Sequence, residues 1–260
     1  MNKFYTYLLG FFFHFLYSQT SNAIDYQEYL FIHNANQCNN YFDHFELKYQ
    51  IPKHLLRSIS IIETGRWNHN SKMYFPWPWS INHAGQSYYF SNKKDAISKV
   101  RELLESGFTN IDIGCMQINL HHHPDAFLDL NQAFEPRDNI EYAATFLIRH
   151  YQQSQNWQQA IAFYHSQAQA GKLYANKVLK IWSKYQDEKY SSNCINYDGK
   201  LIPCNNTTTT NIYSYKEKEK LPLMKANDTN YIKEKANRPK KDPKRLKTSM
   251  ILYSTQDQLQ

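Results

Sequence analysis

Glu63 has an unusual position for an acidic residue, because it follows an apolar stripe near the end of a predicted helix. The segment 51–68 predicts a helix that begins at Pro52 and is stopped by Gly65 through a left-handed C-cap. Its apolar side chains recur at helical spacing and are Leu55, Leu56, Ile59 and Ile62. Glu63 lies on nearly the same face as these residues.

The chemistry that this position favours is proton transfer. A carboxylate at the C-terminal end of a helix faces the negative pole of the macrodipole, and apolar neighbours desolvate it. Both effects raise the carboxyl pKa, as a general acid that works near neutral pH requires. Taken alone, Glu63 could also be a solvated glutamate at a fraying helix end.

A second group of candidate residues lies in the segment 111–127. Gly114 allows another part of the backbone to approach closely. Gln117 and Asn119 carry amides that can bind sugar hydroxyl and acetamide groups, and Met116 offers an adaptable apolar contact. Without further information, such a segment is more often a turn than a binding site.

The third candidate is Tyr164, whose hydroxyl could donate a hydrogen bond toward a carboxylate. The order of the three groups along the chain is more specific than any one of them. Glu-Thr-Gly at 63–65, Gly-x-Met-Gln-Ile-Asn at 114–119 and Ala-x-Tyr at 162–164 together resemble the lytic transglycosylase domain of the soluble type. That domain is related in fold to goose-type lysozyme, and the resemblance covers roughly residues 41–180.

The resemblance implies a role for each matched residue. Glu63 corresponds to the catalytic acid/base, and Tyr164 to the tyrosine that orients it. The substrate-binding residues that we predict are Thr64, Gly114, Met116, Gln117, Asn119 and Tyr164. The implied reaction uses one carboxyl group and neither metal nor cofactor. It cleaves the bond between N-acetylmuramic acid and N-acetylglucosamine in peptidoglycan and leaves a 1,6-anhydro-muramyl product.

The sequence departs from simpler members of this family in three places. Cys115 replaces a common leucine, and His165 stands where asparagine is usual. The interval between the first two groups is also longer and contains the segment PWPWSIN, which we expect to form a cleft wall. The aromatic residues of this longer interval that could pack on sugar rings are Trp77, Trp79, Tyr88 and Tyr89.

The elements that must position these residues are mostly helices. Apolar periodicity predicts helical segments at residues 26–49, 91–107, 139–154, 157–165 and 172–185. Ser91 can cap the second of these segments and Gly107 can stop it. Residues 74–90 carry a turn at Ala84-Gly85 and predict an extended segment or short hairpin. The expected fold class is mainly α, a helical globule with a small hairpin insert, within the lysozyme-like α+β superfamily that the resemblance implies.

Composition divides the 260 residues into three parts. Residues 1–23 combine Lys3, a short apolar run and a small-x-small site at Ala23, which predicts a cleaved signal peptide and a periplasmic location. Residues 24–189 form the expected catalytic domain. Residues 190–260 form a tail, in which residues 201–260 hold 12 basic against 6 acidic side chains, whereas residues 1–200 hold 18 against 17.

The basic tail predicts partners that differ from those of the domain. Its composition is typical of a disordered segment. It could contact an anionic surface or envelope secretion machinery, and export argues against nucleic acid as a partner. The domain itself is nearly neutral, and we expect a monomer that binds peptidoglycan glycan strands.

The four cysteines fit the expectation of export. An even number in an oxidising compartment predicts two disulfides, for which three pairings are possible. We favour Cys194 with Cys204, which bracket a turn-like segment, and this choice leaves Cys38 with Cys115. No CxxC spacing that would favour a metal–thiolate site is present.

Three alternatives remain at this stage. The run of residues 121–123 invites a zinc site, but consecutive histidines do not converge on one ion, so we expect no metal and a structural His123. A hydrolytic muramidase would need a second carboxylate, for which Asp112 is the candidate, although we expect a turn residue there. A non-catalytic wall-binding component of a secretion or conjugation assembly could retain the same fold.

Overall fold

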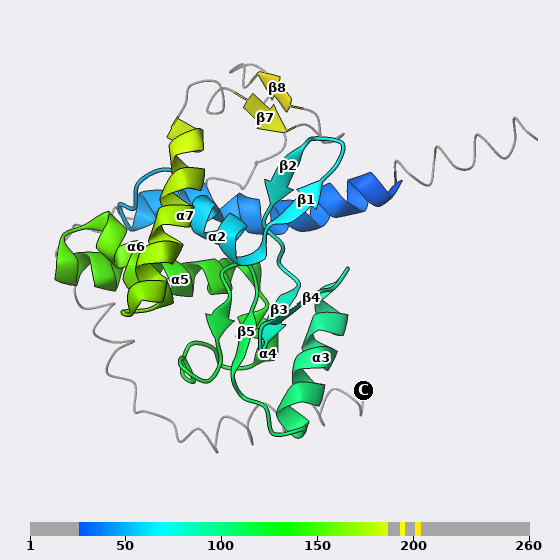
Figure 1. The fold of residues 1–260 in the computed structure, drawn as a ribbon. Coiled ribbons are helices and arrows are strands. Elements are labelled where there is room, and N and C mark those ends of the chain that lie inside the picture. The colour runs from blue at the N-terminus through cyan, green and yellow to red at the C-terminus, as the bar shows by residue number, and fades with distance from the viewer. Residues whose placement is uncertain (1–25, 187–192, 196–200, 204–260) are drawn as a thin grey trace, which may run out of the picture.

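Helices dominate the part of the chain that the computed structural model describes, which comprises residues 26–186, 193–195 and 201–203 (Figure 1). They are the 26–48 helix, α2 (Leu55–Thr64), α3 (Lys93–Glu105), α4 (Leu130–Ala133), α5 (Pro136–Ser154), α6 (Trp157–His165) and α7 (Gln169–Gln186). The prediction of a mainly α fold is confirmed. None of the helices in the described ranges is long and apolar enough to cross a membrane. The expected signal peptide and most of the basic tail lie outside these ranges.

The strands form three antiparallel sheets. They are β1 (Arg66–Asn68), β2 (Met73–Phe75), β3 (Ser80–His83), β4 (Gln86–Tyr89), β5 (Ile111–Ile113), β6 (Ile118–Asn119), β7 (Asn193–Ile195) and β8 (Leu201–Pro203). The largest sheet has the order β4-β3-β5-β6, while β1 pairs with β2 and β7 pairs with β8. The β3–β4 hairpin turns at Ala84 and Gly85, whose φ angles of 53° and 79° suit a tight two-residue turn, as predicted. The sheet content exceeds the single hairpin that we expected, because β1, β2, β5, β6, β7 and β8 form strands as well.

One hydrophobic core holds these elements together. It extends from Ile32 in the 26–48 helix to Val178 in α7 and includes the inward faces of β3 and β5. Figure 1 shows α3 beside β3 and β4, with α5, α6 and α7 grouped on the other side of the sheet. The helix α6 has the predicted bounds, whereas α5 and α7 each begin three residues before the predicted start.

The start of α2 differs from the prediction. Pro52 lies before the helix, which begins at Leu55 after His54 in a left-handed conformation. The buried carboxylate of Glu46, from the 26–48 helix, caps α2 instead: Oε2 accepts from His54 N at 2.7 Å and Oε1 from Leu56 N at 2.8 Å. A distant side chain therefore satisfies the free N–H groups that we assigned to a local proline start.

Two further cap predictions are corrected. Gly65 ends α2 with φ −58° and is not in the left-handed region. A side chain there would collide with the carbonyl group of Ile61, so the glycine is required for close backbone approach. Asn92, and not Ser91, caps α3, because its side-chain oxygen accepts from Asp95 N at 3.0 Å.

The tryptophans of the PWPWSIN segment do not form a cleft wall. Trp77 and Trp79 are 2% and 5% exposed and belong to the core. The Trp77 indole N–H donates to the Phe90 carbonyl at 2.7 Å, and that of Trp79 to Asn34 Oδ1 at 3.3 Å. The insert therefore contributes to the interior, since its large aromatic rings bury more apolar area there than on a surface.

The predicted disulfide between Cys38 and Cys115 is confirmed, with Cα atoms 6.0 Å apart. It joins the 26–48 helix to the segment between β5 and β6 and closes a sequence separation of 77 residues. A loop of this length corresponds to a stabilisation of about 4.5 kcal/mol in the chain-entropy description. The predicted Cys194–Cys204 bridge lies outside the described residues.

Candidate active site

Glu63 lies in the last turn of α2, where that helix packs against α7. Its Oε1 accepts a hydrogen bond from Tyr174 Oη at 2.6 Å. The residue keeps partial exposure, although its carboxyl group is surrounded mostly by protein. Burial raises the pKa of Glu63 to about 7, while the Tyr174 hydrogen bond lowers it and the charge of Asp112 raises it. Glu63 is thus able to hold and release a proton near neutral pH.

The tyrosine that contacts Glu63 is not the one that we predicted. Tyr164 Oη donates to the Met116 carbonyl at 2.8 Å, and Tyr174, from α7, binds the carboxylate. Both phenols are buried and lie beside Glu63. Burial, together with the negative charge of Glu63, raises the pKa of each phenol well above the usual range. The ring of Tyr174 stacks on His165, with centroids 4.6 Å apart and planes at 8°. Tyr174 is therefore a candidate site residue that the sequence analysis missed.

The segment between β5 and β6 is held by a second missed residue, Asn139 of α5. Its side-chain oxygen accepts from Met116 N at 2.9 Å, and its amide donates to the carbonyls of Ile113 and Ala133 at 3.1 Å each. Gly114 has φ 76°, and a Cβ there would lie 2.5 Å from Asn139 Nδ2. The predicted close approach at Gly114 is thus made to a buried asparagine.

Two of the predicted substrate-binding residues lie in the interior. Met116 and Thr64 are both 0% exposed. The Thr64 hydroxyl lies 3.0 Å from the Ser60 carbonyl, to which it donates, and accepts from Trp77 N at 3.0 Å. A second carbonyl, that of Cys115, lies 3.3 Å from the same hydroxyl. These side chains support the site from behind, because a substrate cannot reach them.

Gln117 is placed where it can meet a ligand. Its backbone has φ 48°, and its amide nitrogen donates to the Gly114 carbonyl at 3.0 Å and the Ser80 carbonyl at 3.3 Å. In the described part of the chain, no hydrogen bond reaches its side-chain oxygen. The amide is therefore fixed by the backbone and leaves an acceptor available.

A row of polar side chains crosses one face of the four-stranded sheet. Asp112 pairs with Asn82 on one side and Asn119 on the other, and Asn82 pairs with Ser87. Asn119 Nδ2 donates to Asp112 Oδ1 at 2.7 Å, and Asn82 Nδ2 to Ser87 Oγ at 3.1 Å. Asp112 is a strand residue and not the turn residue that we expected. Burial raises its pKa, which the Asn119 hydrogen bond lowers.

The comparison with known proteins identifies the family of this region. Residues 90–191 match the family model described as Transglycosylase SLT domain. The chain contains a transglycosylase SLT domain. Such lysozyme-like domains belong to the soluble lytic transglycosylases, enzymes that act on peptidoglycan. No curated protein and no solved structure matches the chain significantly.

The match to the SLT domain begins after Glu63, so it does not itself assign the catalytic residue. It includes the 114–119 segment, Tyr164 and Tyr174. Helix α2 lies outside the match but shares the core with it. The assignment of Glu63 thus depends on its geometry beside Tyr174.

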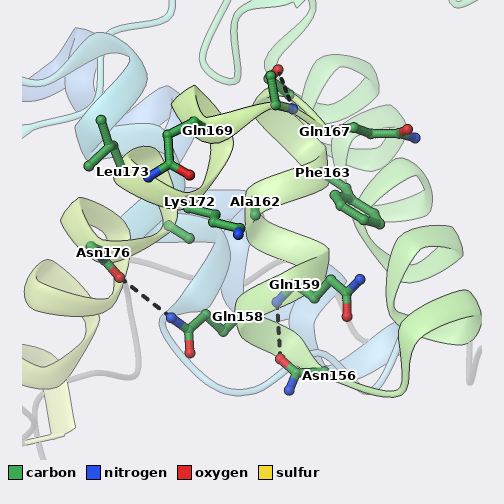
Figure 2. Close-up of a pocket in the computed structure, with 13 residues that line it drawn as sticks. Asn156, Gln158, Gln159, Ala162, Phe163, Gln167, Gln169, Lys172, Leu173 and Asn176 are labelled. Carbon is green, nitrogen blue, oxygen red and sulfur yellow. Dashed lines mark hydrogen bonds between the residues drawn. The ribbon is translucent and has the colours of Figure 1, made fainter.

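A hollow on the SLT domain lies away from Glu63. It has a volume of about 560 Å³ and lies between α6 and α7, as Figure 2 shows. Six of its thirteen lining residues carry amide side chains, and these are Asn156, Gln158, Gln159, Gln167, Gln169 and Asn176. Neither Glu63 nor Tyr174 lines it, so the hollow and the candidate active site are different places.

Two groups of residues bear on metal binding. His123 packs on Phe146, and its Nδ1 lies 3.0 Å from Tyr142 Oη, which fits the predicted structural role. Within the described ranges, ligand atoms of Asp43, Glu46 and His54 lie within 4.8 Å of one another. Both oxygens of Glu46 already accept backbone N–H groups, so we assign this group to the capping of α2.

Proposed function

We propose that this chain is a peptidoglycan lytic transglycosylase that cleaves the β-1,4 bond between N-acetylmuramic acid and N-acetylglucosamine, with Glu63 as its only acid/base. The SLT domain supports the class of enzyme and its substrate. The residue assignment depends on the Glu63 carboxyl group, which has a pKa of about 7 and accepts a hydrogen bond from Tyr174 at 2.6 Å. A group with this pKa can act as acid and then as base near neutral pH.

Glu63 carries both proton transfers in this proposal. Tyr174 binds Oε1, which leaves Oε2 to donate the proton to the glycosidic oxygen as the C1–O bond breaks. The substrate's acetamide stabilises the oxocarbenium-like centre, as in substrate-assisted glycosidases. Glu63 then removes the proton of the muramyl 6-hydroxyl, whose oxygen bonds to C1. This attack is favoured because the 6-hydroxyl is tethered at high effective concentration.

Some of the surrounding residues contact the substrate in this proposal, and others hold the binding segment in place. Gln117 offers its fixed side-chain oxygen to a substrate hydroxyl or N–H group. Asn119 lies on the sheet face beside Asp112 and contributes to the same binding surface. Gly114, Met116, Thr64 and Tyr164 hold the backbone of this segment in place.

The product analysis tests the reaction directly. Purified peptidoglycan treated with the protein should release muropeptides with 1,6-anhydro termini, which are lighter by one water than hydrolytic products. Mass spectrometry distinguishes the two. No release by the wild-type protein would favour a non-catalytic wall-binding role. Equal release by Glu63→Gln would instead remove Glu63 from the mechanism.

A hydrolytic muramidase is the second candidate, because the position of Asp112 favours it. Asp112 is half-buried on the sheet, and its charge raises the pKa of Glu63. A second carboxylate near the first could position water as the acceptor. Reducing-end muramic acid as the main product, with an Asp112→Asn loss comparable to that of Glu63→Gln, would establish this alternative.

We also propose the location and domain limits from the sequence. Cleavage after Ala23 would export the chain to the periplasm, and the domain would end near residue 189. N-terminal sequencing of the exported protein tests the cleavage site.

Removal of residues 190–260 should leave activity on soluble glycans intact but weaken salt-sensitive binding to anionic surfaces or secretion machinery. Unfolding of the truncated protein would contradict the proposed boundary.

A further inference from the structure

Arg66, the first residue of β1, lies in an enclosure of aromatic rings. Its guanidinium carbon is 4.2 Å from the ring centroid of Trp77, 5.4 Å from that of Phe31 and 5.5 Å from that of Tyr89. These rings come from the 26–48 helix, the PWPWSIN segment and β4. Contacts between a guanidinium and aromatic rings hold the cation while leaving its edge N–H groups available.

The guanidinium has no anionic partner in the described part of the chain. None of the ion pairs or hydrogen bonds among the described residues involves it. Arg66 is partly buried, and burial lowers the pKa of its guanidinium. A partly desolvated guanidinium with five free donors favours an oxyanion, and a carboxylate matches its planar fork.

Two carboxylates on the elements next to Arg66, Glu28 and Glu63, bind other groups. Glu28, one turn before Phe31 on the 26–48 helix, accepts from Asn68 Nδ2 at 2.9 and 3.1 Å. Glu63 is bound by Tyr174, and its pKa reflects the field of Asp112 and not that of Arg66. The guanidinium of Arg66 therefore has no carboxylate partner among the described residues.

The position of Arg66 connects it to the candidate active site. It follows Glu63 by three residues, which can span no more than about 11 Å. Tyr89 pairs with Ser80 in the β3–β4 hairpin, and the Ser80 carbonyl accepts from Gln117 Nε2 and Gly114 N. The aromatic enclosure thus adjoins the segment that we propose as the substrate contact.

We propose that Arg66 binds a carboxylate of the glycan strand beside the bond that Glu63 cleaves, and so selects muramic-acid-containing glycans over neutral ones. This inference rests on the proposed function. Peptidoglycan has two sources of carboxylate, the lactyl group of a muramic acid without its peptide and the acidic residues of a peptide stem. Both have the planar geometry that a guanidinium binds in a bidentate manner.

The test measures binding by calorimetry in the full chain with Glu63→Gln, which prevents turnover. The ligands are a neutral N-acetylglucosamine tetramer, a peptide-free muramic-acid tetramer and the same tetramer with peptide stems. Arg66→Gln should weaken binding of one or both anionic ligands at least tenfold and leave the neutral ligand within about twofold, since tenfold corresponds to about 1.4 kcal/mol. Arg66→Lys should give an intermediate loss for the same ligands, because it keeps the charge without the fork.

A matched control and the fold of each variant make the result decisive. Arg149→Gln removes an arginine that lies 5.5 Å from a single ring, that of Phe146, and should change none of the affinities. A loss confined to the peptide-free tetramer assigns the lactyl carboxylate, and one confined to the stem-bearing tetramer assigns the peptide. An equal loss for neutral and anionic ligands in the folded Arg66→Lys protein would overturn this inference alone. Failure of the parent to bind any glycan would overturn the proposed function with it.

Discussion

Two glutamates serve the two ends of α2 and have similar pKa values but different surroundings. Glu46 reaches the N-terminal end from the 26–48 helix, and Glu63 belongs to the last turn. Burial raises the pKa of each to about 7. A raised pKa therefore does not by itself identify the catalytic acid in this protein.

The hydrogen-bond partners separate the two groups. Both oxygens of Glu46 accept backbone N–H groups, and the residue is 3% exposed. Glu63 has one oxygen bound by a phenol, while in the described part of the chain no hydrogen bond reaches its Oε2. This difference in hydrogen bonding is why we propose Glu63 as the acid/base and assign Glu46 to the helix cap.

The largest expected effect is the loss of catalysis in the Glu63→Gln variant. The amide keeps the shape of the side chain but cannot transfer the proton, so the release of anhydro-muropeptides should fall by at least about 10²–10⁴-fold. Thermal unfolding should show an intact fold. Activity within about threefold of wild type would remove Glu63 from the mechanism.

Glu46→Gln should produce the opposite result. One of its oxygens becomes an NH₂ group that faces a backbone N–H, so the free energy of unfolding should fall by about 1–3 kcal/mol. Denaturant unfolding measures this loss. Turnover should persist at temperatures where the variant is folded, and its disappearance there would make Glu46 part of the catalytic machinery.

Tyr174→Phe should change catalysis through the pKa of Glu63. The hydrogen bond from Tyr174 lowers that pKa, so its removal should raise the pKa and move the alkaline decline of kcat/KM to higher pH. We expect about a tenfold loss of rate at neutral pH, which corresponds to one hydrogen bond of about 1.4 kcal/mol. Tyr164→Phe is the matched control, because Tyr164 binds the Met116 carbonyl and should leave the pH profile in place.

The last prediction concerns the dependence of stability on pH. The pKa of each glutamate is raised from 4.5 to about 7 on folding, so the folded state holds protons that the unfolded chain has released between these values. The stabilisation is therefore complete below pH 4.5 and is lost as the pH rises through 7. Denaturation at pH 5 and pH 8 should show this fall, and Glu63→Gln should reduce it. An unchanged fall in that variant would place the titration elsewhere.

The sequence by itself determined those structural features that depend on residues close to one another along the chain. Apolar periodicity predicted α2 and α6, and the Ala84-Gly85 pair predicted the β3–β4 turn. The same local pattern placed Glu63 at the end of an apolar helix. These features depend on side chains within a few residues of one another, so propensity and spacing are sufficient to predict them.

The tertiary structure alone decided which side chains meet. Tyr164 and Tyr174 have the same chemistry, and only the packing of α7 against α2 brings the second one to Glu63, 111 residues earlier in the chain. Glu46 caps α2 from another helix in the same way, which no N-cap pattern beside Pro52 could indicate. The physical reason is that a buried hydrogen bond needs a partner within about 3 Å, and such distances between remote residues are set by helix packing and not by local propensity.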